Sequence, residues 1–193
     1  LFTDNHSTDG TFQRLEALSR RDPRVRVLRF SRNFGFQRSI LTGYLNARGD
    51  AAVQIACDLP DPPALILQFV QRWQEGFQVV YGVRRGRKEG VVVTGLRKVF
   101  YRLIDWLSET PLPVDAGDFR LVDRVVLDEL ARMQDYHPYL RGAIAAMGFQ
   151  QTGLVYDRAE RTAGESKFPL SALIRLAVDG ILNHSVVPLR VAT

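Results

Sequence analysis

Acidic side chains follow two short apolar segments of the sequence, where they could do chemistry. Asp4 follows the segment that opens the chain, and Asp58 follows residues 51–57, the most apolar of the predicted strands. A carboxylate at the end of a strand can accept a hydrogen bond from a nucleobase N–H or a ribose hydroxyl, as we expect for Asp4. For Asp58, the same position suits an oxygen ligand for Mg²⁺ or Mn²⁺ beside a diphosphate.

Two further polar stretches have structural explanations. Asp61, which precedes Pro62, is interpreted as the N-cap of a helix that begins with proline. Ser7, Thr8 and Asp9 precede an amphipathic segment, so they equally fit a helix cap or a ligand loop.

Basic residues cluster at three places. The run Arg84–Lys88 fits a solvated loop or a site for a phosphate or an anionic lipid headgroup, because no aromatic residues interleave with it as in nucleic-acid sites. Asp118 and Arg120 would point the same way on a strand, as a surface ion pair or as part of a site. The third cluster consists of Arg158, Arg161 and Lys167 around a predicted flexible turn, and it suits the binding of a phosphate.

The composition is that of a packed globular domain. The 193 residues include 26 Lys and Arg against 21 Asp and Glu, a formal net charge of +5, and 46% are hydrophobic. Disorder is therefore excluded, and the charge permits an anionic partner. The single cysteine, Cys57, excludes an internal disulfide and is interpreted as packing within a buried strand.

Short apolar stretches alternate with amphipathic ones along the chain. Strands are predicted at the opening residues 1–4 and at 25–30, 51–57, 77–81 and 154–156; helices are predicted around 12–18, 40–45, 63–73 and 90–107. This alternation predicts an α/β fold, a mostly parallel sheet with helices on both faces. Ligands of such sheets bind at the carboxyl ends of the strands, where Asp4 and Asp58 lie.

The end of the chain is predicted to differ from residues 1–169, which we expect to form one domain. The apolar segment 170–193 is interrupted by charged residues and falls short of a membrane-spanning helix. Within it, residues 171–184 place apolar side chains on one face, which suits either a helix at a membrane interface or an ordinary docking helix. The chain reads as an excerpt from a longer protein.

Five motifs in order resemble those of the family 2 glycosyltransferases, in the branch that acts on polyprenyl phosphates, such as dolichyl-phosphate mannosyltransferases and undecaprenyl-phosphate glycosyltransferases. They are Ser7–Thr11, Ser31–Gly35, Asp58–Pro63, Gly117–Leu121 and Glu160–Phe168. The resemblance implies a GT-A fold, a Rossmann-like arrangement, whose opening strand would precede Leu1. It also implies a nucleotide-sugar donor, a divalent metal ion and a lipid-phosphate acceptor.

The resemblance also implies roles for individual residues. Asp4 and Asn5 match the paired-aspartate segment that holds the nucleoside, with Asn5 in the second place and His6 where the family has glycine. Asp58 matches the second aspartate of the D-x-D metal motif, in which Ala56 takes the first place. The implied nucleotide-sugar ligands are Asp4, Asn5, Asn33 and Asp58; the implied catalytic residues are Asp118 and Arg120; and the implied lipid-phosphate ligands are Arg84, Arg120, Arg161 and Lys167.

The function implied is transfer of a hexose from a UDP- or GDP-linked sugar to a polyprenyl phosphate, with inversion and with Mg²⁺ or Mn²⁺. The implied location is the cytoplasmic face of a membrane, with no nucleic-acid partner. The alternative is a catalytically degenerate nucleotide-binding or scaffolding module of the same fold. A dinucleotide-binding oxidoreductase is set aside, because the sequence lacks a Gly-x-Gly-x-x-Gly loop.

Overall fold

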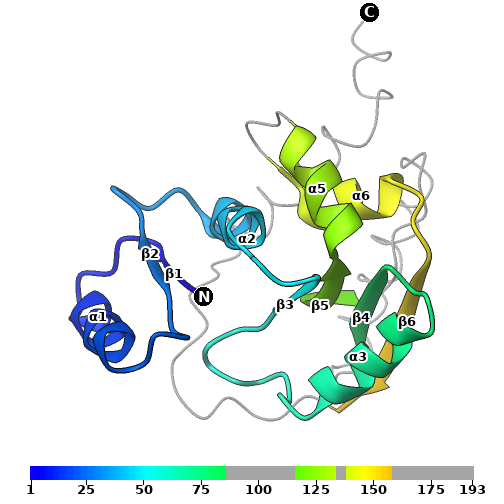
Figure 1. Cartoon of the computed structure of the whole chain (residues 1–193), viewed down its shortest axis with the longest axis horizontal. Helices are drawn as coiled ribbons and strands as arrows, with labels where there is room; N and C mark the ends of the chain where they lie inside the picture. Colours follow the sequence, from blue (N-terminus) through cyan, green and yellow to red (C-terminus); the bar gives the residue numbers. More distant parts are fainter. Residues whose placement is uncertain (86–115, 134–137, 158–193) are drawn as a thin grey trace, which may run out of the picture. The chain divides into compact units, whose positions relative to one another are not determined.

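The computed structural model describes residues 1–85, 116–133 and 138–157 (Figure 1). The predicted helices 90–107 and 171–184, the predicted terminal segment 170–193 and the cluster with Arg161 and Lys167 lie outside these residues. The chain divides into two compact units. The first unit comprises Leu1–Ala52 and Val122–Leu140, and the second comprises the described parts of Val53–Leu121 and Arg141–Thr193.

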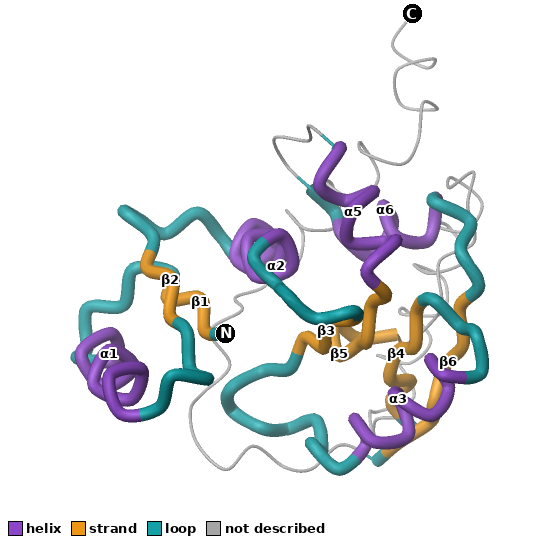
Figure 2. Tube along the Cα trace, in the orientation of Figure 1, coloured by secondary structure: helices purple, strands orange, loops and turns teal. Residues whose placement is uncertain are grey.

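The first unit is built on a pair of parallel strands. β1 (Phe2–Asp4) pairs with β2 (Val27–Arg29), so that Asp4 lies opposite Arg29 in the register. Helix α1 (Thr11–Arg21) connects the two strands and packs against both of them, and α2 (Phe36–Leu45) packs against β1 and α5 (Arg124–Arg132) (Figure 2). This arrangement brings the loops after β1 and β2 to the same edge of the strand pair.

Local hydrogen bonds define the starts of the helices in this unit. Gly10, with φ of 76°, is the N-cap residue of α1, and the Asp9 carboxylate accepts a hydrogen bond of 3.2 Å from the backbone N–H of Thr11. Asp123 caps α5 by accepting a hydrogen bond of 2.8 Å from the Val125 N–H. These carboxylates satisfy donors that a helix leaves without partners at its first turn.

The second unit is built around strands of a four-stranded sheet with the order β3-β5-β4-β6. The strands are β3 (Ala51–Gln54), β4 (Val79–Arg84), β5 (Ala116–Asp123) and β6 (Gln151–Tyr156), and β4 and β6 pair in parallel. The sheet is accompanied by α3 (Leu65–Gln74) and α6 (Leu140–Ala146). Phe69 of α3 is fully buried and lies 4.7 Å, between ring centroids, from Phe119 of β5.

Two of the structural interpretations made from the sequence are wrong. Asp61 is not the N-cap of α3, because the helix begins at Leu65 and its N-cap residue is Ala64. Asp61 instead is buried and accepts a hydrogen bond from the Tyr156 hydroxyl. Cys57 is exposed rather than packed in a strand, because β3 ends at Gln54 and the chain turns there, with a hydrogen bond of 3.2 Å from the Leu59 N–H to the Ala56 carbonyl.

Among the described residues, the structure contains no helix with the length and apolar character needed to cross a membrane.

Candidate active site

Two asparagines predicted to bind a nucleotide sugar lie together in the first unit. Asn5 follows β1, and its Nδ2 donates a hydrogen bond of 2.8 Å to Oδ1 of Asn33 in the loop after β2. Asn5 Oδ1 accepts a hydrogen bond of 2.9 Å from the Phe34 N–H, and Asn33 Oδ1 also accepts one of 2.9 Å from the Gly35 N–H. The two side chains therefore bind the loop after β1 to the loop after β2.

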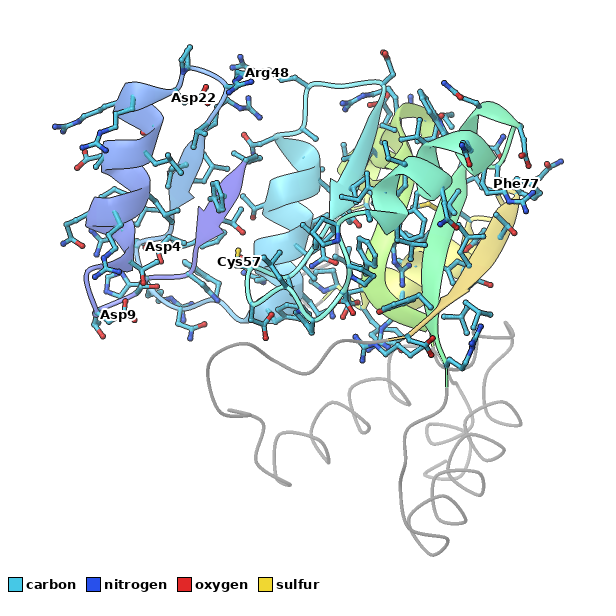
Figure 3. All side chains as sticks on the ribbon, turned by 90° about the horizontal axis from the view of Figure 1, so that it is seen from below. Asp4, Asp9, Asp22, Arg48, Cys57 and Phe77 are labelled. Atoms are coloured by element: carbon cyan, nitrogen blue, oxygen red, sulfur yellow. The ribbon has the colours of Figure 1, made fainter. Side chains whose placement is uncertain are left out.

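Asp4 is the last residue of β1 and directly precedes the first of these loops. Its side chain is buried, and Oδ1 accepts a hydrogen bond of 3.1 Å from the Ser7 N–H. Oδ2 lies 3.6 Å from Nε of Arg29 and has no hydrogen-bond donor among the described residues. Figure 3 shows Asp4 and Asp9 at one end of the first unit and Asp22 and Arg48 at the other. The carboxyl ends of β1 and β2 thus carry the polar residues, as expected for an α/β sheet.

The backbone at His6 explains the glycine that the family motif has at this place. His6 has a φ of 66°, in the left-handed region that residues other than glycine rarely adopt. Its imidazole Nδ1 lies 3.2 Å from the Phe30 carbonyl oxygen. In this chain the left-handed position is taken by a histidine, whose imidazole lies beside the end of β2.

Asp58, the predicted metal ligand, lies in a turn of the second unit. The turn follows β3, and its residue Leu59 is exposed and has a φ of 48°. Asp58 itself is half-buried, whereas Pro60 and Asp61 are buried. The turn therefore presents the Asp58 region toward solvent and is fixed at its far end in the core.

Asp118 and Arg120, the predicted catalytic residues, both lie on β5. Asp118 is half-buried and forms an ion pair with Arg141 of α6, with 3.4 Å between Oδ1 and Nε. Arg120 is buried, and its guanidinium donates a hydrogen bond of 3.0 Å to the carbonyl oxygen of Gly117. The partner Arg141 lies 23 positions further along the chain, and no motif in the sequence indicated it.

Arg84, predicted to bind a lipid phosphate, lies at the end of β4 in a polar cluster. Its Nε is 3.4 Å from the hydroxyl oxygen of Tyr156 and 3.9 Å from Oδ1 of Asp61. The Arg84 guanidinium packs closely against Gly117 of β5, where an added Cβ would lie 3.0 Å from it. Burial of Tyr156, followed by its hydrogen bond to Asp61, raises the pKa of the tyrosine, so the hydroxyl remains a donor at neutral pH.

The residues present fit a divalent cation that is shared with a ligand. No group of three or more His, Cys, Asp or Glu side chains within the described ranges could hold a metal ion by itself. Mg²⁺, however, is often held by one or two carboxylates together with phosphate oxygens and water. Asp58 supplies one such carboxylate, and Ala56 supplies none.

The structure thus places the predicted residues in two groups. Asp4, Asn5 and Asn33 belong to the first unit, whereas Asp58, Arg84, Asp118 and Arg120 belong to the second. Arg29 and Tyr156 are further residues of the two groups that the sequence reasoning missed. Arg29 is the last residue of β2 and Tyr156 is the last residue of β6. The rule that ligands bind at the carboxyl ends of strands could therefore have indicated both.

Several curated relatives match over the whole chain, among them the following two. The "Uncharacterized glycosyltransferase YkcC" of Bacillus subtilis (strain 168) is 44% identical over 194 residues, which are 100% of this chain and 60% of the relative. The "Bactoprenol glucosyl transferase" of Shigella phage SfV is 35% identical over 194 residues, 100% of this chain and 63% of the relative. The chain therefore spans less than two thirds of the length of either relative.

Solved structures confirm the predicted GT-A fold. The mannosyltransferase PcManGT of Pyrobaculum calidifontis, in complex with GDP-Man and Mn2+, matches with a TM-score of 0.56 at 18% identity, over 91% of this chain and 50% of that one. The glucosyl-3-phosphoglycerate synthase of Mycobacterium tuberculosis matches with a TM-score of 0.51 at 22% identity, over 94% of this chain and 66% of that one.

The family itself is shown by the sequence match. Residues 1–131 match glycosyl transferase family 2, which confirms the resemblance drawn from the five motifs. Those residues include every predicted site residue that the structure describes. Since the match covers more than half of the chain and the fold agrees, the chain belongs to glycosyl transferase family 2.

Proposed function

We propose that this chain is the catalytic part of an enzyme that transfers a hexose from a UDP- or GDP-linked sugar to a polyprenyl phosphate. The observation that carries the proposal is the 35% identity to a bactoprenol glucosyl transferase over the full chain. Transfer would take place at the cytoplasmic face of a membrane, with the amphipathic segment 170–193 at the interface and residues 1–169 as the catalytic domain.

The donor nucleoside is proposed to bind at the loops after β1 and β2. Asn5 and Asn33 hold these loops together, and Asp4 supplies a carboxylate oxygen that has no hydrogen-bond donor among the described residues. A buried acceptor without a donor costs free energy, about 1–3 kcal/mol. A ribose hydroxyl or a nucleobase N–H would satisfy it.

Asp58 is proposed to bind Mg²⁺ or Mn²⁺ together with the diphosphate of the donor. Asp58 is a half-buried residue that follows β3, and the structure of PcManGT contains Mn2+ with GDP-Man. The bound ion would stabilise the negative charge of the departing nucleoside diphosphate.

The acceptor phosphate is proposed to bind among basic residues of the second unit and of the segment that follows it. Arg84 and Arg120 are the described members, and Arg161 and Lys167 lie outside the described residues. A phosphate monoester has a second pKa of about 6, so it is mostly a dianion at neutral pH and needs little help from a base.

The proposed reaction is a single displacement. A phosphate oxygen of the acceptor attacks the anomeric carbon, and the bond from that carbon to the diphosphate oxygen breaks, with the electron pair leaving on the nucleoside diphosphate. The configuration at the anomeric carbon therefore inverts. Asp118 is already in an ion pair with Arg141, which fits a role in orienting basic groups rather than in removing a proton.

The test uses the full-length protein in detergent or vesicles, with a short-chain polyprenyl phosphate and UDP- or GDP-linked hexoses in the presence of Mn²⁺. We expect a polyprenyl monophosphate sugar and release of the nucleoside diphosphate, both identified by mass spectrometry. Release of the nucleoside monophosphate would instead show transfer of a sugar phosphate. Binding of the nucleotide without any transfer would favour the scaffolding module.

A matched pair of variants links the activity to the site. Asp58→Asn should abolish most of the transfer. Asp128→Asn, which changes an exposed carboxylate of α5, should leave the transfer unchanged. Equal activity of the two variants would contradict the role assigned to Asp58.

A further inference from the structure

A buried polar cluster lies beside the turn that carries Asp58. The Asp61 residue is 3% exposed, and its Oδ1 accepts a hydrogen bond from the hydroxyl of Tyr156, which is 5% exposed. Nε of Arg84 lies 3.9 Å from the same carboxylate oxygen and 3.4 Å from the same hydroxyl. Asp61 is thus held from β6 and from β4, two strands that pair in parallel.

The cluster is closely packed, so its members have little freedom to move. The Tyr156 ring packs edge-on against Phe119, with 6.0 Å between centroids, and a Cβ at Gly82 would lie 2.6 Å from its Cε1. The Arg84 guanidinium passes so close to Gly117 that a Cβ there would lie 3.0 Å away. The hydroxyl is therefore a fixed hydrogen-bond donor to Asp61, and the guanidinium is a fixed cation beside the carboxylate.

The turn itself needs such an anchor. Leu59 is not glycine, yet its φ of 48° lies in the left-handed region, which costs about 1 kcal/mol for an ordinary side chain. The residue is 51% exposed, so little packing holds this conformation in place. The turn is instead held at its C-terminal end, where Pro60 and Asp61 are buried.

We propose that Tyr156 and Arg84 are positioning residues, which hold the turn 56–61 through Asp61 and thereby fix Asp58 for the metal ion and the donor diphosphate. The inference rests on the proposed function, because it assumes that Asp58 serves a metal–diphosphate complex. It assigns Asp61 and Tyr156 a task that the family motifs did not indicate, and it assigns Arg84 a task besides the predicted contact with a lipid phosphate.

The first experiment measures the turn directly, without substrate. Amide hydrogen exchange of the full-length protein is followed by mass spectrometry for Tyr156→Phe, which removes the donor hydroxyl and retains the ring. The Leu59 N–H, bonded to the Ala56 carbonyl, reports on the turn. We expect its exchange to be about tenfold faster, which corresponds to about 1.4 kcal/mol.

The matched control is Tyr81→Phe. Tyr81 lies on β4, where its ring borders Gly153 rather than Asp61, so the same chemical change is made outside the cluster. Exchange at Leu59 should be unchanged in this variant. If Tyr156→Phe does not fold, Arg84→Lys replaces it in the exchange and Mn²⁺-binding experiments, because it keeps the charge and removes the guanidinium geometry; the transfer assay is not used for this variant, since Arg84 is also proposed to contact the acceptor phosphate.

The second experiment separates positioning from a merely structural role. In the transfer assay, Tyr156→Phe should raise the Mn²⁺ concentration for half-maximal activity and the KM for the nucleotide sugar by about tenfold, without changing the KM for the polyprenyl phosphate. An unchanged exchange rate at Leu59 would overturn the anchor. Faster exchange with unchanged Mn²⁺ and donor dependence would overturn the positioning role.

The two proposals can fail separately. If the unmodified protein transfers no sugar, the proposed function fails, and the inference is then tested by binding of Mn²⁺ with UDP or GDP, measured by electron paramagnetic resonance. Weaker binding in Tyr156→Phe than in Tyr81→Phe would support the inference. Equal binding, or no binding by the unmodified protein, would overturn it.

Discussion

Asn5 and Asn33 are joined by a hydrogen bond of 2.8 Å from Nδ2 to Oδ1, although they lie 28 positions apart and follow different strands. Each of them also accepts a backbone N–H of the loop after β2. The two residues that the sequence predicts to bind the nucleotide sugar therefore also hold together the loops at which the nucleotide sugar is proposed to bind. A substitution at either place should change both the stability and the binding of a nucleotide.

The first prediction concerns the coupling between these two asparagines. Asn5→Ala and Asn33→Ala each remove the bond between the side chains and leave a backbone N–H without its acceptor. We expect a coupling energy of about 1 kcal/mol in a double-mutant cycle of unfolding free energies. Chemical denaturation of the two single variants and the double variant measures it. Strictly additive effects would show that the bond contributes nothing.

The second prediction concerns which of two acidic residues, Asp58 or Asp118, contributes more to the transfer activity. Asp58→Ala removes the only carboxylate proposed for the metal ion, so we expect a loss of transfer activity of about 100-fold or more. Asp118→Asn keeps the size of the side chain and weakens its ion pair with Arg141, so it should lose less activity than Asp58→Ala. Initial rates at saturating substrates decide the order. A larger loss at Asp118 would make it the proton acceptor.

The third prediction concerns two glycines that differ in their surroundings. Gly82→Ala would place a Cβ 2.6 Å from the packed Tyr156 ring, and we expect destabilisation by about 1–3 kcal/mol. Gly43→Ala lies in α2, where the Cβ would meet Thr3 at an ordinary 3.7 Å, and it should stabilise by about 0.5–1 kcal/mol. Thermal unfolding checks the opposite signs, and a stable Gly82→Ala would show that the ring can move.

The fourth prediction concerns the pH dependence of stability. The pKa of Tyr156 in the folded protein is raised above its ordinary value of 10.0, first by burial and then by its hydrogen bond to Asp61. The stability from this group is therefore fully present below pH 10 and is lost as the pH rises through the folded-state pKa. Melting temperatures between pH 8 and 11 should fall more steeply for the unmodified protein than for Tyr156→Phe. Parallel curves would contradict this assignment.

Much of the fold followed from patterns along the chain. The predicted strands 25–30 and 51–57 contain β2 and the whole of β3, and the predicted helix 63–73 overlaps α3 closely. Apolar residues at regular spacing report such elements because the spacing depends only on neighbours in the sequence. Helices α5 and α6 were missed, since no prediction was made for residues 124–132 and 140–146.

For the candidate site too, some features could be predicted from the sequence and others only from the structure. The sequence by itself determined the family, because the order of five motifs needs no coordinates, and it determined that acidic residues follow strands. Only the tertiary structure decided which side chains meet: Asn5 with Asn33, and Asp118 with Arg141.

Asp61 shows the physical reason. Its neighbour Pro62 favoured a helix cap, which is a local interaction, whereas its actual partner Tyr156 is 95 positions away. A buried carboxylate takes the donors that packing brings to it, and the pairing of β4 with β6 brings Tyr156 and Arg84 to one place. Contacts of that kind depend on how strands pair across the sheet, which residue spacing along one chain does not encode.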